Sequence, residues 1–262
     1  MNIINRINGS IIFSYVDVDK SKTVLAAIEK EIDLTNADLT GIELIDVDLE
    51  GISLHNSDLS CSKFIRTNLS DSDFSLATLN NVYFIGVNLK FSDMSNCKIH
   101  GSYFDKANLS NATLAFSEIT FSNFENAFLE SACLIGTKLC SSTFKYANFR
   151  YADLSNSYCG SSNFEDANFE NANMTRISLR DSIMLRANLN SANLRNADMN
   201  GAKLTGANLR RANLIGADMM GVNLDRALLG KTCLCGADLR MASVENVDFR
   251  NSDTSHALWL GE

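Results

Sequence analysis

The sequence predicts an all-β solenoid, in which the chain winds through many similar coils around a narrow apolar core. Three observations support this fold class: a large apolar residue recurs at every fifth position, a small residue stands two positions before it, and phenylalanine recurs at every twentieth position over part of the chain. A period of five fits neither the strand period of about 2 nor the helix period of about 3.6. Repetition at a fixed period is typical of solenoids, so it is the first feature to interpret.

The five-residue period runs without insertion or deletion from Leu34 to Phe249, which gives 44 consecutive pentapeptides. The large residue, here named the central residue of each unit, is Leu 25 times, Phe 10 times, Met 5 times, Ile twice, and Val and Cys once each. The residue two positions before it is Ala 20 times, Ser 11, Val 5, Ile 4, Thr 3 and Cys once, and it is never charged. These two positions are therefore expected to point inward and the other three outward.

Residues 20 apart share their type at several positions, which predicts a coil of four pentapeptides. One column consists of phenylalanine and a second of asparagine, the latter interrupted by Phe128: Phe64, Phe84, Phe104, Phe124, Phe144 and Phe164; Asn68, Asn88, Asn108, Asn148, Asn168, Asn188 and Asn208. Stacked rings gain from offset packing, and stacked amides can form a hydrogen-bonded ladder. Ten of the 12 glycines in the repeat region stand two residues after a central residue, which predicts a corner with positive φ there.

The stretch "ANLNSANLRNADMNGAKLTGANLRRANLIGADM", residues 187–219, resembles the pentapeptide repeat family with its A-(D/N)-L-x-x unit. The resemblance covers about four fifths of the chain. It implies a right-handed quadrilateral parallel β-helix in which each pentapeptide forms one side. Four pentapeptides in each coil divide the 44 units into about 11 coils, and a spacing of about 4.8 Å gives a rod roughly 50 Å long.

The two ends of the chain depart from the repeat and are expected to form separate segments. Residues 1–33 predict an N-terminal cap, with a strand over 9–16 and a helix over 19–32 whose N-cap is Asp19 or Ser21. The β-helix is expected over residues 34–253. The register fails at Thr254, and residues 254–262 then form a C-terminal cap or a dimerisation tip. Leu258, Trp259 and Leu260 are three consecutive apolar residues there, and they are the candidate interface of an end-to-end homodimer.

The composition excludes several classes of protein. The formal net charge is −8 and the sequence pI about 5.0, so direct nucleic-acid binding is not expected. No stretch approaches the roughly 18 apolar residues of a membrane span, and the N-terminus is a poor signal peptide. Seven cysteines without a CxxC pair suit a reducing compartment. The expected location is therefore the cytoplasm, or outside the cell by a route without a classical signal peptide.

No catalytic, cofactor or metal site can be named from the sequence, so an enzyme is not expected. Asp17, Asp19 and Ser21 imitate the start of a calcium loop, but Lys22 stands where that loop needs glycine. The three histidines occupy unlike phases of the four-pentapeptide coil, which argues against a shared metal or a catalytic triad: His55, His100 and His256.

The outer surface is the remaining source of function. Residues 1–100 hold 8 Lys and Arg against 14 Asp and Glu, a net charge of −6, whereas residues 181–262 hold 9 of each. Four outward aromatic residues form the candidate partner-binding site: Tyr83, Tyr103, Phe121 and Phe128. Tyr83 and Tyr103 are one coil apart. Aromatic residues together with Arg favour a protein partner.

Three classes of function follow from this surface and from the family resemblance. The first is a non-enzymatic protein-binding rod with an unidentified partner, a class that in this family includes bacterial effectors delivered into host cells. The alternative is an acidic DNA mimic that binds a type II topoisomerase and protects or inhibits it, as the quinolone-resistance members of the family do. The third is an enzyme, for which no site is visible. A smooth acidic column on one face would favour mimicry, and a patch of aromatic and Arg residues would favour a protein partner.

Overall fold

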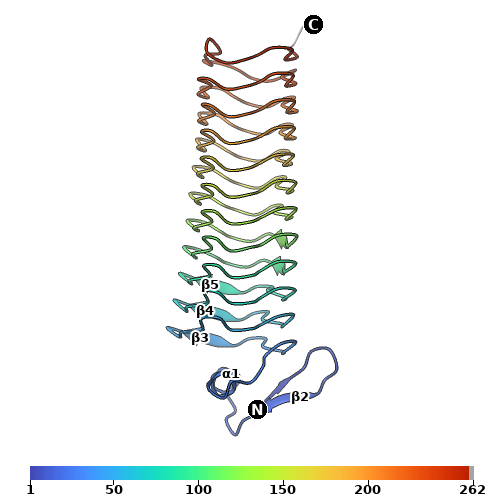
Figure 1. The fold of residues 1–262 in the computed structure, drawn as a ribbon, viewed down its shortest axis with the longest axis vertical. Coiled ribbons are helices and arrows are strands. Elements are labelled where there is room, and N and C mark those ends of the chain that lie inside the picture. The colour runs from blue at the N-terminus through green and yellow to red at the C-terminus, as the bar shows by residue number, and fades with distance from the viewer. Residues whose placement is uncertain (260–262) are drawn as a thin grey trace.

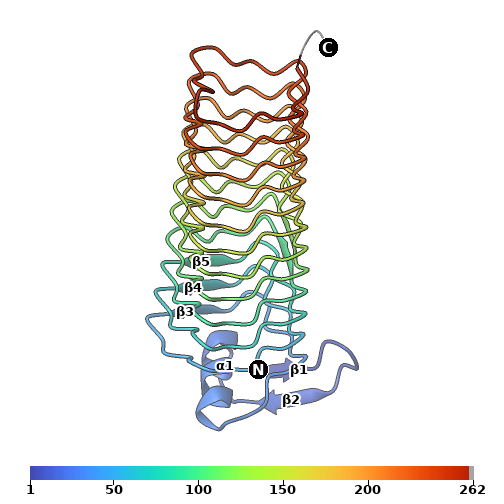
Figure 2. The ribbon, with the colours of Figure 1, turned by 45° about the horizontal axis from the view of Figure 1, so that its top comes forward.

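In a computed structural model, which describes residues 1–259, the chain forms a long rod of stacked coils with a small N-terminal segment at one end (Figure 1). The rod rises from the N-terminal segment to the C-terminus in one direction. Figure 2, in which the top is tilted forward, shows the coils stacked along a single axis. This arrangement leaves each coil in contact only with the coils directly above and below it.

Backbone pairing between equivalent residues of successive coils holds the rod together. Three strands form one parallel sheet, in which Glu43 pairs with Lys63 and Lys63 with Tyr83: β3 (Glu43–Ile45), β4 (Lys63–Ile65) and β5 (Tyr83–Ile85). A second parallel pair consists of β6 (Lys98–His100) and β7 (Glu118–Thr120). Elsewhere single parallel bridges with the same spacing continue as far as the pair Asp238 and Leu258. This pairing confirms the coil of four pentapeptides predicted from the phenylalanine column.

Corners keep the strands short. The residue two after the central residue has a positive φ at corner after corner, in glycines such as Gly41 (72°) and in other residues such as Phe116 (60°). All ten glycines expected at corners have a positive φ, and the other two repeat glycines, Gly160 and Gly230, do not. In most units a hydrogen bond closes the turn, as the Ala107 N–H does by donating to the Phe104 carbonyl at 3.0 Å. A negative then a positive φ at the two inner residues of such a turn is the type II pattern.

Serine hydroxyls replace this turn bond at several corners. Ser62 Oγ accepts from the N–H of Ile42 at 3.2 Å and donates to the carbonyl of Leu39 at 3.0 Å, so it joins the two backbone groups of an open turn in the coil below. Ser102 and Ser117 make the same pair of contacts one coil down. Buried backbone groups therefore stay hydrogen-bonded where the turn is open.

The core is filled along its whole length by the central residues. The six phenylalanines of the predicted column are fully buried and stack on one another with ring centroids 4.3–5.1 Å apart. A second, shorter stack joins Phe149 and Phe169 at 4.7 Å. The asparagine column is hydrogen-bonded in part, as where the Asn88 amide donates to Asn68 at 2.7 Å. Within residues 1–259 the packed interior therefore leaves no room for a ligand.

The N-terminal segment consists of an antiparallel hairpin and one helix. The strands are β1 (Asn2–Ile4) and β2 (Ile11–Ser14), and the helix is α1 (Lys20–Glu29), which is shorter at both ends than the range 19–32 expected from the sequence. Asp19 is the N-cap and accepts from the Ser21 N–H at 2.8 Å. The hairpin reaches the first coil, where the Asp38 N–H donates to the Ile4 carbonyl at 2.8 Å. β1 was not predicted, because three residues at a chain end give too short a pattern to recognise.

Candidate binding surfaces

An exposed apolar patch covers the outer face of the sheet β3–β4–β5. It consists of the residue after each central residue and of two tyrosines before central residues: Ile45, Ile65, Ile85, Tyr83 and Tyr103. Because equivalent residues of successive coils pair directly, the three isoleucines form one column and the tyrosines a second. Ile45, Tyr83 and Tyr103 are each about 40% exposed, and Ile65 and Ile85 are half-buried. The isoleucine column was not predicted, although isoleucine at the same position of three successive coils is visible in the sequence.

The two tyrosines form the most ordered part of the apolar patch. Their rings stack with centroids 4.8 Å apart and planes 8° from parallel, and Tyr83 pairs with Tyr103 through the backbone. Phe121 lies two residues before Asn123, which pairs with Tyr103, so it stands at the neighbouring corner. It is 66% exposed and its ring meets the edge of His100 at 5.4 Å. Two of the four candidate aromatic residues therefore share one side of the rod, and Phe121 stands at the corner beside them.

Phe128, the fourth candidate, lies on a different side of the coil. Its backbone pairs with Asn108 and Asn148, and its side chain lines a shallow hollow together with Lys90 and Phe91. The structure therefore does not bring it into contact with the stacked tyrosines. The sequence could have shown this. The residue one coil above Tyr103 is Asn123, and Phe128 comes one pentapeptide later, which places it on the next side of the coil.

Ion pairs follow the same coil-to-coil spacing as the backbone. Six of them join residues one coil apart: Glu43–Lys63, Asp46–Arg66, Glu118–Lys138, Lys145–Glu165, Arg150–Glu170 and Asp166–Arg186. Two of these border the apolar patch, and Arg66 holds Asp46 with both a 2.7 Å and a 2.6 Å hydrogen bond. The hydrogen bond from this guanidinium lowers the pKa of Asp46. Carboxylates along the rod are thus often neutralised by a cation in the next coil.

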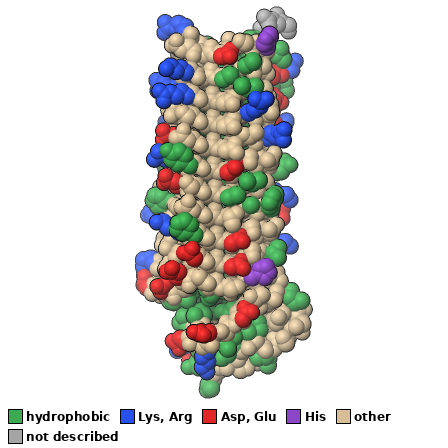
Figure 3. Space-filling view, viewed as in Figure 1, with side chains coloured by type: hydrophobic (Ala, Val, Ile, Leu, Met, Phe, Trp, Pro, Cys, Tyr) green, Lys and Arg blue, Asp and Glu red, His purple; other side chains and the backbone are tan. Residues whose placement is uncertain are grey.

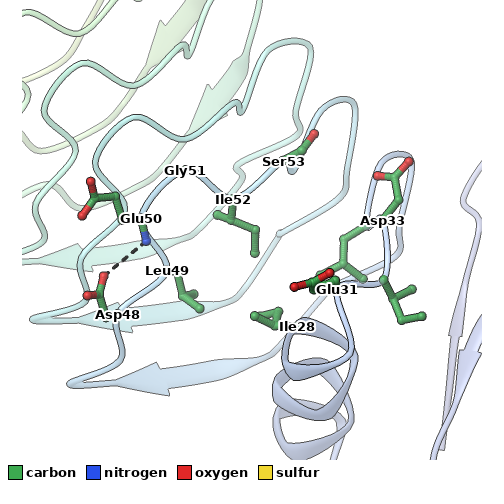
Figure 4. A pocket seen from close by; sticks show the side chains of 11 residues that line it. Ile28, Glu31, Asp33, Asp48, Leu49, Glu50, Gly51, Ile52 and Ser53 are labelled. Carbon is green, nitrogen blue, oxygen red and sulfur yellow. Dashed lines mark hydrogen bonds between the residues drawn. The ribbon is translucent and has the colours of Figure 1, made fainter.

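A second hollow, of about 530 Å³, lies between the end of α1 and the first coils (Figure 4). Its walls carry four carboxylates, Glu31, Asp33, Asp48 and Glu50, above an aliphatic floor. Asp48 accepts from the Glu50 N–H at 3.3 Å and from the Asn68 amide at 2.7 Å, so this carboxylate is held by neighbours of its own chain. No His, Cys, Lys or Arg is among the residues that line the hollow.

Two of the reactive side chains, Ser75 and Cys159, lack the arrangement of a catalytic nucleophile. Ser75 Oγ donates to Asp73 at 2.6 Å and lies 2.7 Å from His55 Nδ1. A serine nucleophile must direct its hydroxyl hydrogen to the histidine that acts as base, whereas the Ser75 hydroxyl donates its hydrogen bond to the Asp73 carboxylate. Burial raises the pKa of the Cys159 thiol to about 12, so the thiolate is absent near neutral pH. Within residues 1–259, no three His, Cys, Asp or Glu side chains gather in a metal-binding arrangement.

The geometry of these sides agrees with a comparison of the sequence with protein families. The model of pentapeptide repeats matches eight times, over residues 32–71, 62–101, 72–111, 92–130, 122–158, 162–201, 202–240 and 217–253. The chain belongs to the pentapeptide repeat family. Pentapeptide repeat proteins fold as right-handed quadrilateral β-helices, and the four-sided coils with pairing between equivalent residues are that fold.

Solved pentapeptide repeat structures are similar to this chain. HetL, involved in heterocyst differentiation regulation in the cyanobacterium Nostoc sp. strain PCC 7120, has 23% identity and a TM-score of 0.35, covering 90% of this chain and 95% of HetL. A trypsin-treated form of QnrB1, a plasmid-mediated fluoroquinolone resistance protein, has 16% identity and a TM-score of 0.47, covering 84% and 90%. Rfr23 from the cyanobacterium Cyanothece 51142 has 27% identity and a TM-score of 0.20, covering 39% and 63%. The comparison with curated proteins found no match.

The C-terminal end of the pentapeptide rod is only partly closed. Trp259 occupies the central position five residues after Thr254. It is half-buried and meets Phe249 edge to face, with ring centroids 5.2 Å apart. Leu258 is 44% exposed, and Leu260 lies outside the described residues. Val244 and Phe249 in the last coil are half-buried, unlike the central residues further down the rod. Among the described residues, the last coil therefore keeps apolar side chains partly exposed even with Trp259 packed on Phe249.

Charge is distributed unevenly along the pentapeptide rod. On the face shown in Figure 3, carboxylates gather towards the N-terminal end and cations towards the C-terminal end. No helix among residues 1–259 has the length and apolar character needed to cross a bilayer.

Proposed function

We propose that this pentapeptide repeat protein is a non-enzymatic rod that binds a protein partner through the apolar patch. The observation that carries the proposal is the stacked pair Tyr83 and Tyr103 beside the isoleucine column, on a side where the backbone is a parallel sheet. Such a surface is ordered before binding, so little side-chain or loop entropy is lost on association. Tyrosine is also enriched among residues that dominate binding energy.

The border of the apolar patch supports the same interpretation. Glu43 with Lys63 and Asp46 with Arg66 place charged groups of both signs next to apolar side chains. An apolar centre with a polar rim is the usual composition of a protein interface. Phe121 extends the apolar surface around one corner of the rod, so a partner with a concave apolar surface and charged groups of both signs at its edge fits best.

Acidic DNA mimicry, the alternative, needs unpaired carboxylates in a long run to imitate the phosphates of a duplex. The ion pairs between successive coils work against it, because cations such as Lys63, Arg66 and Lys138 neutralise carboxylates on the same sides. Inhibition of topoisomerase supercoiling by the purified protein at submicromolar concentration would favour the mimic over the partner-binding rod.

A photo-crosslinking capture tests the binding site. A photoreactive amino acid replaces Tyr103 in one variant and Tyr146, an exposed tyrosine on another part of the rod, in the matched control. We expect crosslinked products from bacterial or host lysates at position 103 that disappear when Tyr83→Ser and Ile65→Ser are added. Equal crosslinking at 103 and 146 would contradict the proposal.

Delivery into a host cell is the finer form of this proposal, in which the rod acts as a bacterial effector. A translocation reporter fused to the chain tests it separately from binding. Signal in infected host cells that depends on the secretion system of the bacterium is expected. Cytoplasmic retention in the bacterium would leave the binding role in place and remove the effector role.

We also propose that the C-terminal end pairs with a second copy of the chain in a C2 dimer. The half-buried last coil and the exposed Leu258 leave apolar surface at this end, which a second copy would cover. The competing arrangement is a monomer in which Trp259 alone closes the core. Light scattering on the intact chain and on Trp259→Ser distinguishes them, because a mass of 28.8 kDa for the intact chain at tens of micromolar would refute the dimer.

A further inference from the structure

Three cations meet in a groove near the C-terminal end of the rod, far along the chain from the apolar patch. The groove, named here the cationic groove, has a volume of about 490 Å³ and is lined by Asn190, Asn208, Arg210, Arg211, Gly230, Lys231 and Asn251. No carboxylate is among these residues. Arg210, Arg211 and Lys231 are all exposed, and none of the three makes an ion pair within residues 1–259.

At six places between Glu43 and Arg186 a cation and a carboxylate one coil apart neutralise each other, as in Asp46–Arg66 and Arg150–Glu170. Arg211 and Lys231 also stand one coil apart in a single corner column, but they carry the same sign, and Arg210 adds a third positive charge beside them. Like charges that line one groove repel one another, and an anion between them removes this repulsion.

A glycine leaves the groove open on one side. Gly230 stands in the column of Glu170, Asn190 and Arg210, where each other residue has a side chain. Its φ is not positive, so the turn does not require glycine at this position. The missing side chain therefore provides room beside Arg210 without serving the backbone.

The backbone pairing is locally shifted beside the groove. The Arg211 N–H donates to the Gly230 carbonyl, whereas the equivalent Lys231 N–H donates to the carbonyl of Asn251, one residue beyond the position that the repeat would place there. An adjoining hollow shares Arg210, Gly230 and Asn251 with the groove, and the carboxylate in its lining, Asp248, is paired with Arg250 at 2.7 Å.

We infer that the cationic groove binds an anion of the phosphate class that carries two adjacent phosphate groups. Arginine guanidinium groups hold phosphate oxygens in a two-pronged geometry, and lysine adds a mobile point charge. The cations come from two successive coils, so two linked phosphate groups along the rod axis contact all three. Asn251 adds an exposed amide. No aromatic side chain lines the groove, so recognition is confined to the phosphates and disregards any base or sugar attached to them.

The binding measurement uses the intact chain at low ionic strength. Inorganic pyrophosphate is titrated by calorimetry, and a nucleoside diphosphate is titrated in parallel to distinguish the free anion from the same group on a larger molecule. Arg211→Gln combined with Lys231→Gln should raise the Kd at least 10-fold. Arg226→Gln, which removes a cation outside the groove, should change the Kd less than twofold. Equal weakening in both variants would mean general attraction and would overturn the inference.

A second pair of variants tests the site without removing any of its three cations. Gly230→Glu places a carboxylate one coil from Arg210, as Glu170 is placed relative to Arg150 in the same column, and a Cβ at 230 meets Arg210 no closer than 3.7 Å. We expect this variant to fold and to lose pyrophosphate binding more than 10-fold, whereas Gly230→Gln, equal in size and uncharged, should retain most of it. Pyrophosphate binding by Gly230→Glu equal to that of the unchanged chain, or no saturable binding by the unchanged chain at millimolar pyrophosphate, refutes the site.

Discussion

Removing one ring from the phenylalanine stack should destabilise the rod far more than removing an exposed ring of the same size. Phe104 is fully buried, with Phe84 at 4.9 Å on one side and Phe124 at 4.3 Å on the other. Phe116 is 65% exposed at a corner. The comparison of Phe104→Ala with Phe116→Ala therefore tests the inward and outward assignment of the five-residue register.

The magnitudes follow from burial and from the number of stacked neighbours. A buried Phe→Ala change lowers the free energy of unfolding by about 3–5 kcal/mol. Phe104 loses two aromatic neighbours, so the value should lie in the upper half of that range. Phe64 stacks only on Phe84. Phe64→Ala should therefore lower the free energy of unfolding by less than Phe104→Ala does, and the difference should be the value of one aromatic pair, roughly 0.5–1.5 kcal/mol. Phe116→Ala should change stability by under about 1 kcal/mol, and the backbone at φ 60° is equally strained in both forms.

Equilibrium unfolding in urea, followed by far-ultraviolet circular dichroism, measures these differences. Hydrogen exchange adds a spatial check, because loss of Phe104 should speed exchange in the coils next to it before the distant ones. Equal losses for Phe104→Ala and Phe116→Ala would refute the register, and uniform acceleration of exchange over the whole rod would refute the one-dimensional coupling.

Three further changes test other parts of the structure. Deleting residues 1–33 removes the bond from Asp38 to Ile4 and uncovers Leu34 and Leu39, so size-exclusion chromatography should show aggregates, and a monodisperse product would contradict this. Leu76→Asn should raise the unfolding free energy by about 1 kcal/mol, because φ is 62° there and asparagine tolerates that region better; an unchanged melting temperature would argue against corner strain. The Asp46 carboxyl should titrate with a pKa below 3.8 by NMR and return to that value in Arg66→Gln. A lowered pKa in the folded chain means that this pair stabilises above pH 3.8 and that its contribution fades as the pH falls through the folded value.

Much of the fold could be predicted from the sequence, because the repeat records the geometry at every unit. The central residue of each unit is large because it fills the core, and the residue two positions before is small because it lies beside the central residue. Glycine is frequent at the corners because φ is positive there. The column of phenylalanines shows the coil length directly. The isoleucine column at Ile45, Ile65 and Ile85 obeys the same arithmetic and could have been found with it.

The remainder depended on contacts that a repeat does not encode. β1 pairs with β2 and with the first coil through only a few residues, and no periodic pattern marks it. The shifted hydrogen bond from Lys231 to Asn251 is a local contact, so the opening beside Gly230 has no sequence signal of its own. The candidate binding sites were the hardest part to predict. An outward side chain does not have to fit the core, and this fit is what makes the inward residues recognisable in the sequence.

The division of each coil into four sides of one pentapeptide each has a consequence for how such a rod changes over generations. Gain of one full coil between the apolar patch and the cationic groove would move them apart by about 4.8 Å and leave both pointing as before. Gain of a single pentapeptide would rotate everything beyond it by a quarter turn, while every central residue still met a hydrophobic neighbour. Duplication alone can therefore change either the distance between two binding surfaces or the angle between them. New arrangements of the surfaces can arise in evolution while the core packing stays the same.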